Sequence, residues 1–443
     1  MTHFRPVSTE LIPERALLVG VDLHDGGWPT ESSLDELARL VESAGANPVG
    51  RMVQRMARPN PRSMIGSGKL EELKSTVSRL DVDVVIFDED LTPSQQNNIE
   101  RAIGASVKII DRTALILDIF GMRAQTREGS IQVQLAQLEY LLPRLRGMWT
   151  HLAKEQTRGG IGSRFGQGES QLEVDRRLIR KRISALKRSL LQIETRRDVQ
   201  SRARRESPAF RIALAGYTNA GKSTLMNRLT GSDIMSADKL FATLDPTTRA
   251  FKLPGGRLCT LTDTVGFIQK LPHGLVDAFK STLAEARDSD IILEVVDASD
   301  ENYLRQMSAV DVVLDEIGAS EQRRVTVLNK IDLIDPLDRA DLERRHPDAE
   351  LVSSVNGLGI ERLLERLSCE ASTLDSVISL RIPYREAALI SLVHEQGHVL
   401  QEVFDEDAVR LVADIPPRVA ERLIRYRDAS TDQLSEPEME KKQ

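Results

Sequence analysis

The sequence has 443 residues, 40% of them hydrophobic, and a formal net charge of −7. That length exceeds one ordinary hydrophobic core, so several domains are expected. The acidic balance excludes a chain that binds nucleic acid through an overall basic charge, but a local basic patch remains compatible with it.

Targeting and redox signals are scarce. The first residues lack an apolar signal core, and no run of about 18 apolar residues occurs, so we expect no membrane span and a cytoplasmic protein. The two cysteines, Cys259 and Cys369, lie far apart without metal-ligand spacing. Two buried free thiols in a reducing compartment are therefore expected.

Residues 1–120 alternate short apolar runs with amphipathic segments. We expect strands at Ala16–Leu23, Pro48–Met56, Val82–Phe87 and Val107–Ile110. Helices are expected at Ser33–Ser43, at Lys69–Leu80 and from Thr92 onward. This alternation predicts an N-terminal α/β domain with a parallel sheet.

Residues 121–206 have a different character. Apolar residues recur at helical spacing in Gln125–Leu145 and again in Leu172–Arg205. Between them, Gly159–Gly168 holds five glycines in ten residues, which indicates a flexible loop. We therefore predict a helical hairpin joined by a glycine-rich loop.

The remaining chain predicts a second and a third domain. Strand and helix patterns alternate over residues 207–374, beginning with the apolar strand Phe210–Ala215. Residues 375–429 form a small module with a helix at Ala387–Glu395 and strands at Val399–Phe404 and Val409–Val412. The polar residues 430–443 are expected to be a disordered tail.

A phosphate-binding motif follows the first strand of the second domain. Gly216–Ser223 reads G-x-x-x-x-G-K-S and precedes the helical segment Thr224–Leu229. Glycines in such a loop let backbone N–H groups surround phosphates, while the lysine reaches the β- and γ-phosphates and the serine hydroxyl binds Mg²⁺. Lys222 and Ser223 have these roles here, but the motif does not identify the base.

The motif that identifies the base is Asn329-Lys330-Ile331-Asp332, which follows the expected strand Val325–Leu328. The Asp332 carboxylate can accept hydrogen bonds from N1–H and the exocyclic amine of guanine, and adenine has no such donor pair on that edge. Ser353 and Ser354 fill the place of the last base-contacting loop, with a plain turn as the alternative.

A γ-phosphate motif lies between these two. Asp263-Thr264-Val265-Gly266 follows an expected strand; Asp263 is expected to hold Mg²⁺ through water, and the Gly266 N–H to sense the γ-phosphate. The next residue, Phe267, cannot orient water as a glutamine does, so we expect slow intrinsic hydrolysis.

A GTPase also needs a threonine whose hydroxyl ligates Mg²⁺ in the GTP-bound form. Thr243, Thr247 and Thr248 all satisfy that requirement on chemistry alone.

These motifs together resemble those of the HflX family of ribosome-associated GTPases, within the Obg–HflX group. The resemblance is carried by Phe241–Arg249 (FATLDPTTR), Asp263–Phe267 (DTVGF) and Asn329–Asp332 (NKID). Segments outside the GTPase domain also resemble family motifs: Asn60–Lys69, Phe87–Gln96, Arg123–Gly129, Gly159–Arg164 and Gly168–Glu173.

The resemblance implies an N-terminal α/β domain with a helical hairpin, a Ras-like GTPase domain and a small C-terminal α+β domain. It also implies binding to the large ribosomal subunit and its rRNA, with a role in splitting or rescuing stalled ribosomes under stress. We expect a monomer. Thr243 then becomes the magnesium ligand beside Ser223, with Lys222, Thr243 and Gly266 as catalytic groups.

The residues expected to contact GTP or GDP are Gly216, Tyr217, Thr218, Asn219, Ala220, Gly221, Lys222, Ser223, Phe241, Ala242, Thr243, Leu244, Asp245, Asp263, Thr264, Val265, Gly266, Asn329, Lys330, Ile331, Asp332, Ser353, Ser354 and Val355.

Two local departures from the family pattern stand out. Residues 163–170 make the glycine-rich loop one residue longer than the usual form, and they lack its proline. Ser353-Ser354-Val355 replaces the common serine-alanine form.

Potassium is a further candidate cofactor. Asn219, the fourth residue of the phosphate loop, resembles the asparagine that ligates a monovalent cation in several GTPases lacking the glutamine. Such an ion would offset negative charge between the β- and γ-phosphates. The alternative is an Asn219 that only forms hydrogen bonds within its loop.

The RNA-binding candidates are Arg164, in the glycine-rich loop, and Arg176, Arg177 and Arg180, in the helix after it. A basic helix is often only a solvated face, but the adjacent loop and the family resemblance favour ribosomal RNA. Gly66–Lys69, by contrast, reads as a turn entering a helix rather than a second phosphate site. The alternative function is a GTP-dependent switch whose N-terminal region binds a protein or membrane partner.

Overall fold

The chain folds into two units that each contain a parallel-stranded layer. The computed structural model describes residues 13–23, 28–104, 106–155, 167–205, 209–231, 240–241, 243–254, 256–270, 285–373 and 375–428. The N-terminal unit comprises residues 1–193 with 237–245 and 270–280, and the C-terminal unit comprises the rest. Several predictions lie outside the described residues: the tail at 430–443, residues 159–166 of the glycine-rich loop with Arg164, and Ala242.

The N-terminal unit is built on a four-stranded parallel sheet. Its strands lie in the order β2-β1-β3-β4, with bounds β1 Arg15–Asp22, β2 Asn47–Arg55, β3 Val84–Phe87 and β4 Lys108–Asp111. The connecting helices are α1 Thr30–Ser43, α2 Ser67–Leu80, α3 Pro93–Ile103 and α4 Arg112–Arg123. The predicted α/β alternation is confirmed.

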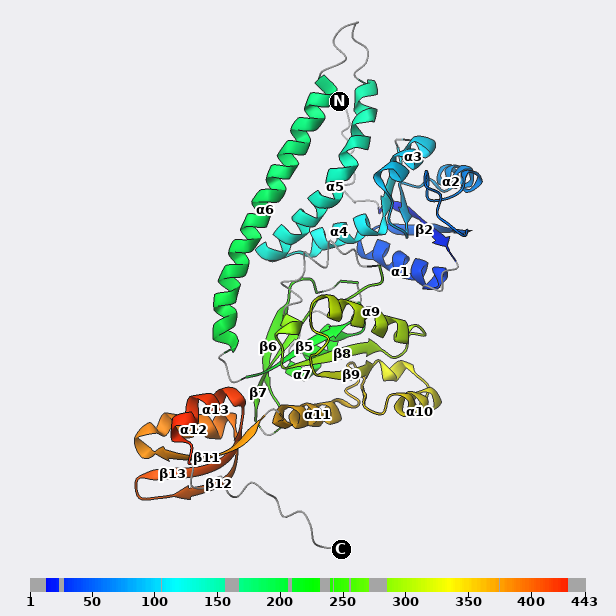
Figure 1. The fold of residues 1–443 in the computed structure, drawn as a ribbon. Coiled ribbons are helices and arrows are strands. Elements are labelled where there is room, and N and C mark those ends of the chain that lie inside the picture. Colours follow the sequence, from blue (N-terminus) through cyan, green and yellow to red (C-terminus); the bar gives the residue numbers. More distant parts are fainter. Residues whose placement is uncertain are drawn as a thin grey trace, which may run out of the picture. The chain divides into compact units, whose positions relative to one another are not determined.

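Both faces of this sheet are buried, which is why its strands are continuous apolar runs rather than alternating ones. On one face, β1 residues Leu17 and Val19 pack with Leu73 of α2 and Ile99 of α3. On the other face, a Cβ on Gly20 of β1 would lie 3.2 Å from Leu34 of α1, and Ile86 of β3 lines a cavity together with Leu115 of α4. The unit is thus doubly wound, with helices on both sides (Figure 1).

No element was predicted between the last strand of this domain and the hairpin, where the structure has α4. Asp111 ends β4 and caps α4, because its Oδ1 accepts a hydrogen bond from the Ala114 N–H at 2.9 Å. The short apolar run from Leu115 to Phe120 carries no clear helical period, so only this cap and the packing on the sheet decide its conformation.

Two long helices form the predicted hairpin, namely α5 Arg127–Glu155 and α6 Gln167–Arg205 (Figure 1). They pack through Leu135 of α5 and Ile183 and Leu186 of α6. The last two residues of the predicted loop, Gln167 and Gly168, belong instead to the first turn of α6. None of the helices in the described part of the chain combines the length and apolar character that a membrane crossing requires.

The C-terminal unit contains a six-stranded sheet in the order β10-β9-β8-β5-β7-β6. Its strands are β5 Phe210–Gly216, β6 Thr247–Lys252, β7 Leu258–Asp263, β8 Ile291–Asp297, β9 Arg324–Asn329 and β10 Glu350–Leu351. All pairs are parallel except the edge pair β6–β7. This mixed sheet confirms the predicted Ras-like architecture.

Helices cover both faces of this sheet. Among the described residues they are α7 Lys222–Thr230, α9 Tyr303–Glu316, α10 Pro336–Arg345 and α11 Ile360–Thr373. Leu225 of α7 and Leu363 of α11 pack into one core with β5 and β8, while α9 lies on the opposite face (Figure 1). Cys259 is buried in this core as predicted, but Cys369 is exposed on α11, so the prediction of two buried thiols is wrong for Cys369.

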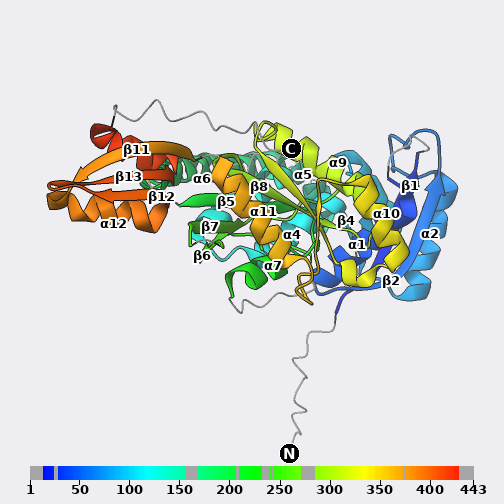
Figure 2. The same cartoon turned by 90° about the horizontal axis from the view of Figure 1, so that it is seen from below.

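A small antiparallel sheet follows in the same unit. Its order is β11-β13-β12, with bounds β11 Ser376–Pro383, β12 His398–Phe404 and β13 Ala408–Ile415. The helices α12 Ala387–Gln396 and α13 Pro417–Leu423 pack against it, as Figures 1 and 2 show. The predicted small α+β module is confirmed.

A buried carboxyl in the central strand β8 makes the stability of this unit pH-dependent. Glu294 is 4% exposed, and its Oε2 accepts a hydrogen bond from Thr326 Oγ1 at 3.5 Å. Burial, with a smaller contribution from Asp311, raises the pKa of Glu294 from 4.5 to about 7. Between these two values the folded state keeps a proton that the unfolded state releases, so the free energy of unfolding decreases as pH rises and levels off above pH 7.

We therefore expect Glu294→Gln to gain stability relative to the parent chain as pH rises, by up to about 3 kcal/mol across the whole window. Urea unfolding of both proteins at several pH values between 5 and 8.5 measures this. Glu343→Gln, on the exposed surface of α10, serves as the control and should follow the parent curve. Parallel curves for the parent and Glu294→Gln would contradict the assignment.

Candidate nucleotide site

The phosphate loop connects the carboxyl end of β5 with the first turn of α7. Gly216, Asn219 and Gly221 have φ angles of 149°, 61° and 93°. A Cβ on Gly216 would lie 2.1 Å from the Val295 carbonyl oxygen, and one on Gly221 would lie 2.2 Å from Asn329 Nδ2. These glycines therefore permit both the backbone turn and the close approach of two neighbouring strand ends.

Lys222 is held inside this loop. Its side chain is buried, and its Nζ donates to the carbonyl oxygens of Gly216 at 3.0 Å and Tyr217 at 2.8 Å. Burial lowers the pKa of Lys222 to about 8, and the nearby Asp263 opposes the shift. An anion in the loop would favour the charged ammonium, so phosphate binding and protonation of Lys222 are coupled.

Two oxygen-bearing side chains, those of Ser223 and Asp263, meet where the phosphate loop approaches β7. Ser223 Oγ donates to Asp263 Oδ2 at 2.6 Å, and Thr264 Oγ1 donates to the Leu214 carbonyl oxygen at 2.6 Å. A hydroxyl and a carboxylate side by side are hard oxygen ligands of the kind that Mg²⁺ prefers. The residues present thus fit a magnesium site, with Ser223 as the direct ligand and Asp263 beside it.

The segment after Asp263 is attached to the phosphate loop through its backbone. The Thr218 N–H donates to the Phe267 carbonyl oxygen at 2.7 Å, and the Phe267 N–H donates to the Gly216 carbonyl oxygen at 3.1 Å. A Cβ on Gly266 would lie 2.9 Å from Thr218 Cα and 3.0 Å from Lys222 Nζ, so glycine brings this backbone close to the phosphate-binding lysine. The Phe267 side chain is buried and offers no hydrogen bond to water.

The base-contacting motifs meet on the other side of the phosphate loop. Asn329 Nδ2 donates to the Ala220 carbonyl oxygen at 2.8 Å, and Asn329 Oδ1 accepts from the Ser354 N–H at 3.0 Å and from Ser354 Oγ at 2.8 Å. Asp332 lies in the short helix Ile331–Leu333 with its carboxylate exposed. Three of the predicted motifs therefore converge at the carboxyl ends of β5, β7 and β9, and Ser354, after β10, joins them.

The predicted residues Phe241, Thr243, Leu244 and Asp245 belong to the N-terminal unit. The Phe241 ring stacks edge-on against Phe120, with centroids 4.5 Å apart. Asp245 Oδ2 accepts hydrogen bonds from the Gln125 and Thr126 N–H groups, each at 2.9 Å.

The other two candidate threonines are part of β6. Thr247 pairs with Asp263 in the β6–β7 ladder, and Thr248 Oγ1 lies 2.9 Å from Thr262 Oγ1. A threonine that binds Mg²⁺ only in the GTP-bound form must be able to change position, which residues paired within a strand cannot easily do. Thr243 lies before the strand β6 and is not held in this way. Thr243 therefore stays the predicted ligand.

Two charged residues next to the base motifs were missed by the sequence reasoning. Arg228, in the last turn of α7, donates to the backbone of the Ser353–Val355 loop, and Asp297, the last residue of β8, forms an ion pair with Lys330. Only the position of Asp297 at the end of an apolar strand could have indicated a role.

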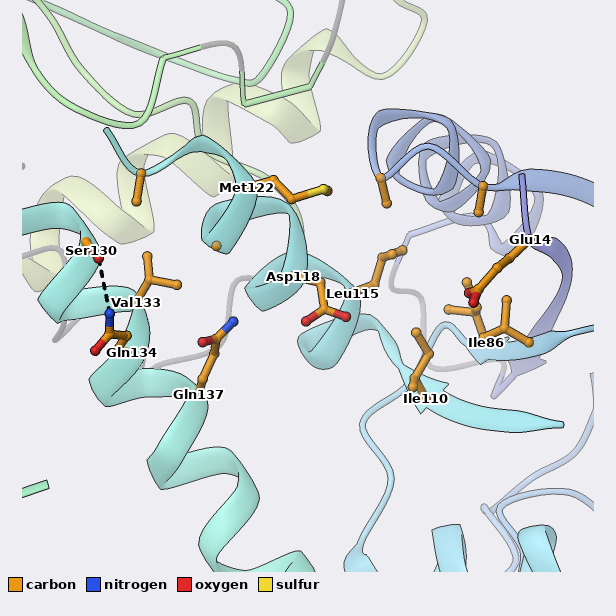
Figure 3. A pocket seen from close by; sticks show the side chains of 15 residues that line it. Glu14, Ile86, Ile110, Leu115, Asp118, Met122, Ser130, Val133, Gln134 and Gln137 are labelled. Carbon is orange, nitrogen blue, oxygen red and sulfur yellow. Dashed lines mark hydrogen bonds between the residues drawn. The ribbon is translucent and has the colours of Figure 1, made fainter. Parts of the chain in front are cut away.

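A cavity of about 590 Å³ lies elsewhere, in the N-terminal unit (Figure 3). Its apolar wall includes Ile86, Ile110 and Leu115, and its polar side chains include Asp118 from α4 and Gln137 from α5. Burial raises the pKa of Asp118. No lining residue belongs to a nucleotide motif, so this cavity is separate from the candidate nucleotide site.

The basic face of α6 is only partly engaged within the hairpin. Arg177 and Arg180 are exposed, and Arg176 is half-buried. Further along, Lys187 pairs with Glu139 of α5 at 2.8 Å. The start of α6 therefore presents guanidinium groups to solvent.

The six-stranded sheet with a phosphate loop between its central strand and the following helix defines a P-loop nucleotide-binding fold, and the Asn329–Asp332 motif beside that loop makes it a P-loop GTPase. Family models match three parts of the chain: residues 31–121 match "GTP-binding GTPase N-terminal", residues 123–204 match "GTP-binding GTPase Middle Region", and residues 211–330 match "50S ribosome-binding GTPase".

Relatives named GTPase HflX align over most of the chain. The protein from Caldanaerobacter subterraneus is 44% identical over 93% of this chain and 93% of its own length. The protein from Escherichia coli is 41% identical over 90% and 94%. This chain belongs to the HflX family of GTPases. A solved structure described as an SsGBP complex with GDP covers 82% of this chain and 99% of its own, with 26% identity and a TM-score of 0.46.

Proposed function

We propose that this protein binds and hydrolyses GTP at the candidate nucleotide site, and that it uses this cycle to act on the large ribosomal subunit. The observation that carries the first part is the convergence of Lys222, the Ser223–Asp263 pair and Asn329 around one phosphate loop. The family description of residues 211–330 as a 50S ribosome-binding GTPase supports the second part.

The chemistry follows from the charge that develops during phosphoryl transfer. Lys222 offsets negative charge on the β- and γ-phosphates, and the Gly266 N–H is available to a γ-phosphate oxygen. Mg²⁺, held by Ser223 and Thr243, would neutralise further phosphate charge. Asn219 is the proposed ligand of an additional potassium ion.

Phe267 stands where many Ras-like enzymes have the glutamine that orients water. Its side chain is buried and apolar, so this position supplies no group to activate water. We therefore infer slow hydrolysis by the free protein and stimulation by the ribosome, which would supply or position the missing group.

The α6 arginines are the proposed RNA contact. Arg177 and Arg180 are exposed and one helical turn apart, so both can reach the same phosphate backbone. Such contacts give affinity and orientation, while the shape of the RNA gives specificity. Splitting or rescue of stalled ribosomes under stress, by a monomer in the cytoplasm, is the proposed role.

Sedimentation with purified large ribosomal subunits tests the proposal. The protein should pellet with the subunits in a non-hydrolysable GTP analogue, and subunits should accelerate GTP turnover. Changing both Arg177 and Arg180 to alanine should weaken binding about tenfold or more and reduce the slope of log K against log salt by about 2. GTP affinity should not change.

The matched control is the double substitution of Arg79 and Arg101, two exposed arginines of α2 and α3, which removes the same charge. It should bind subunits like the parent protein. Failure of the parent protein to pellet would instead favour the alternative of a protein or membrane partner, and equal losses in both double variants would reduce the α6 contact to non-specific charge.

A further inference from the structure

Two charged side chains outside the nucleotide motifs hold the two loops that would contact the guanine base. Arg228 reaches the Ser353–Val355 loop from α7, and Asp297 reaches Lys330 from the end of β8. All four elements belong to the C-terminal unit. Neither residue lies in a motif, and neither is placed to touch a phosphate.

Arg228 binds two successive backbone carbonyls with its planar guanidinium. Its Nη2 donates to the Val355 carbonyl oxygen at 2.5 Å, and its Nε donates to the Ser354 carbonyl oxygen at 3.3 Å. Gly357, with a φ of 83°, lies against the same group, because a Cβ there would be 3.1 Å from Arg228 Nη2. A forked donor of this kind fixes direction as well as distance, which a lysine cannot do.

These bonds close a ring of contacts that joins the Ser353–Val355 loop, Asn329 and the phosphate loop. Ser354 donates to Asn329 Oδ1, and Asn329 Nδ2 donates to the Ala220 carbonyl oxygen in the phosphate loop. The phosphate loop continues into α7, which carries Arg228. The loop after β10 is thus attached to the phosphate loop twice, once through Asn329 and once through Arg228 and α7.

Asp297 holds Lys330 from the neighbouring strand. In the parallel β8–β9 ladder, Asp297 is the register partner of Asn329, so both strands end at the same level. Lys330 Nζ lies 2.6 Å from Asp297 Oδ2, while Asp297 Oδ1 accepts from Ser299 Oγ at 2.6 Å. The Lys330 backbone has a φ of 65°, so its side chain projects from a constrained left-handed position.

We propose that Arg228 and Asp297 are positioning residues for guanine recognition. Arg228 orders the Ser353–Val355 loop along one edge of the base, and Asp297 fixes the Lys330 side chain so that its aliphatic part covers a face of the base. The inference rests on the proposed GTP site. It adds that the affinity for the base depends on two residues that do not touch the nucleotide.

The base is common to GDP and GTP, so loss of either positioning residue should weaken both nucleotides by the same factor. Each lost polar contact should raise the dissociation constants about three- to tenfold, mainly through faster dissociation. The turnover number at saturating GTP should stay unchanged, because the phosphate-binding groups are intact. Loss of a residue that only supports folding would instead lower the melting temperature of the nucleotide-free protein, without an equal loss of GDP and GTP affinity at an unchanged turnover number.

The test uses the full chain with Arg228→Ala, Arg228→Lys and Asp297→Asn. Titration with fluorescent GDP and GTP analogues gives affinities and dissociation rates, steady-state turnover gives kcat and KM, and thermal unfolding without nucleotide reports folding. Arg228→Lys should recover little of the lost affinity, since the fork is absent. The controls are Arg344→Ala and Asp341→Asn on α10, which remove a surface pair.

A double-mutant cycle isolates the action of Asp297. If Asp297 acts only through Lys330, adding Asp297→Asn to Lys330→Ala should cause no further loss of affinity. A full additional loss, unequal losses for GDP and GTP, or unchanged affinities in both single variants would overturn the proposal. A parent protein that binds no guanine nucleotide would overturn the proposed function instead, so the two failures are distinguishable.

Discussion

Gly221→Ala should reduce GTP and GDP affinity by on the order of 100-fold. The φ of 93° at Gly221 is unfavourable for alanine, and the new Cβ would lie 2.2 Å from Asn329 Nδ2. Relief of that overlap requires the loop or Asn329 to move, which breaks the Asn329–Ala220 hydrogen bond and misplaces the N–H groups that face the phosphates. Isothermal titration with GDP measures the loss.

A matched glycine at the other end of α7 provides the control. Gly231 also has a positive φ, of 64°, but a Cβ there would meet nothing within 4 Å. Gly231→Ala should therefore cost about 1 kcal/mol of stability and leave nucleotide affinity unchanged. Similar affinity losses in both variants would show that backbone strain alone, and not the contact with Asn329, limits binding.

Asp332→Asn should exchange guanine preference for xanthine preference. We expect the parent protein to prefer guanine over adenine nucleotides at least ~10-fold, because the Asp332 carboxylate accepts from N1–H and the exocyclic amine. Asparagine presents one donor and one acceptor, which matches the carbonyl that xanthine has in place of the amine. GTP affinity should decrease about 100-fold, and xanthosine triphosphate should bind better than GTP.

Competition of each nucleotide against fluorescent GDP or its xanthine counterpart measures this exchange. Asp335→Asn, three residues further at the start of α10, is the control and should keep the preference for guanine. If Asp332→Asn still prefers GTP, or if the parent protein binds ATP as well as GTP, Asp332 does not read the base.

The sequence by itself determined the class of the protein and the order of its elements. The phosphate loop, DTVG and NKID are each a few consecutive residues at the end of a strand, so residue type and spacing suffice to recognise them. Apolar runs between helical patterns likewise predicted β1, β3 and β5, because strands buried on both faces must be apolar at every position.

Local pattern was insufficient where packing decides the outcome. The apolar segment Leu115–Phe120 has no decisive period, and only its cap at Asp111 and its burial on the sheet make it helical. Cys369 lies on a helix with one buried face, and its position relative to the sheet, rather than its residue type, makes it exposed. Thr247 and Thr248 became strand residues through pairing with β7, which no motif encodes.

The positioning of the base site was decided by tertiary structure alone. Arg228 and Ser354 are 126 positions apart and meet only because the fold of the C-terminal unit brings the last turn of α7 against the loop after β10. Asp297 and Lys330 meet because the parallel β8–β9 register ends both strands at one level. Contacts between residues so distant in sequence depend on strand order and register, which arise from the packing of the whole sheet and leave no signature in neighbouring residues.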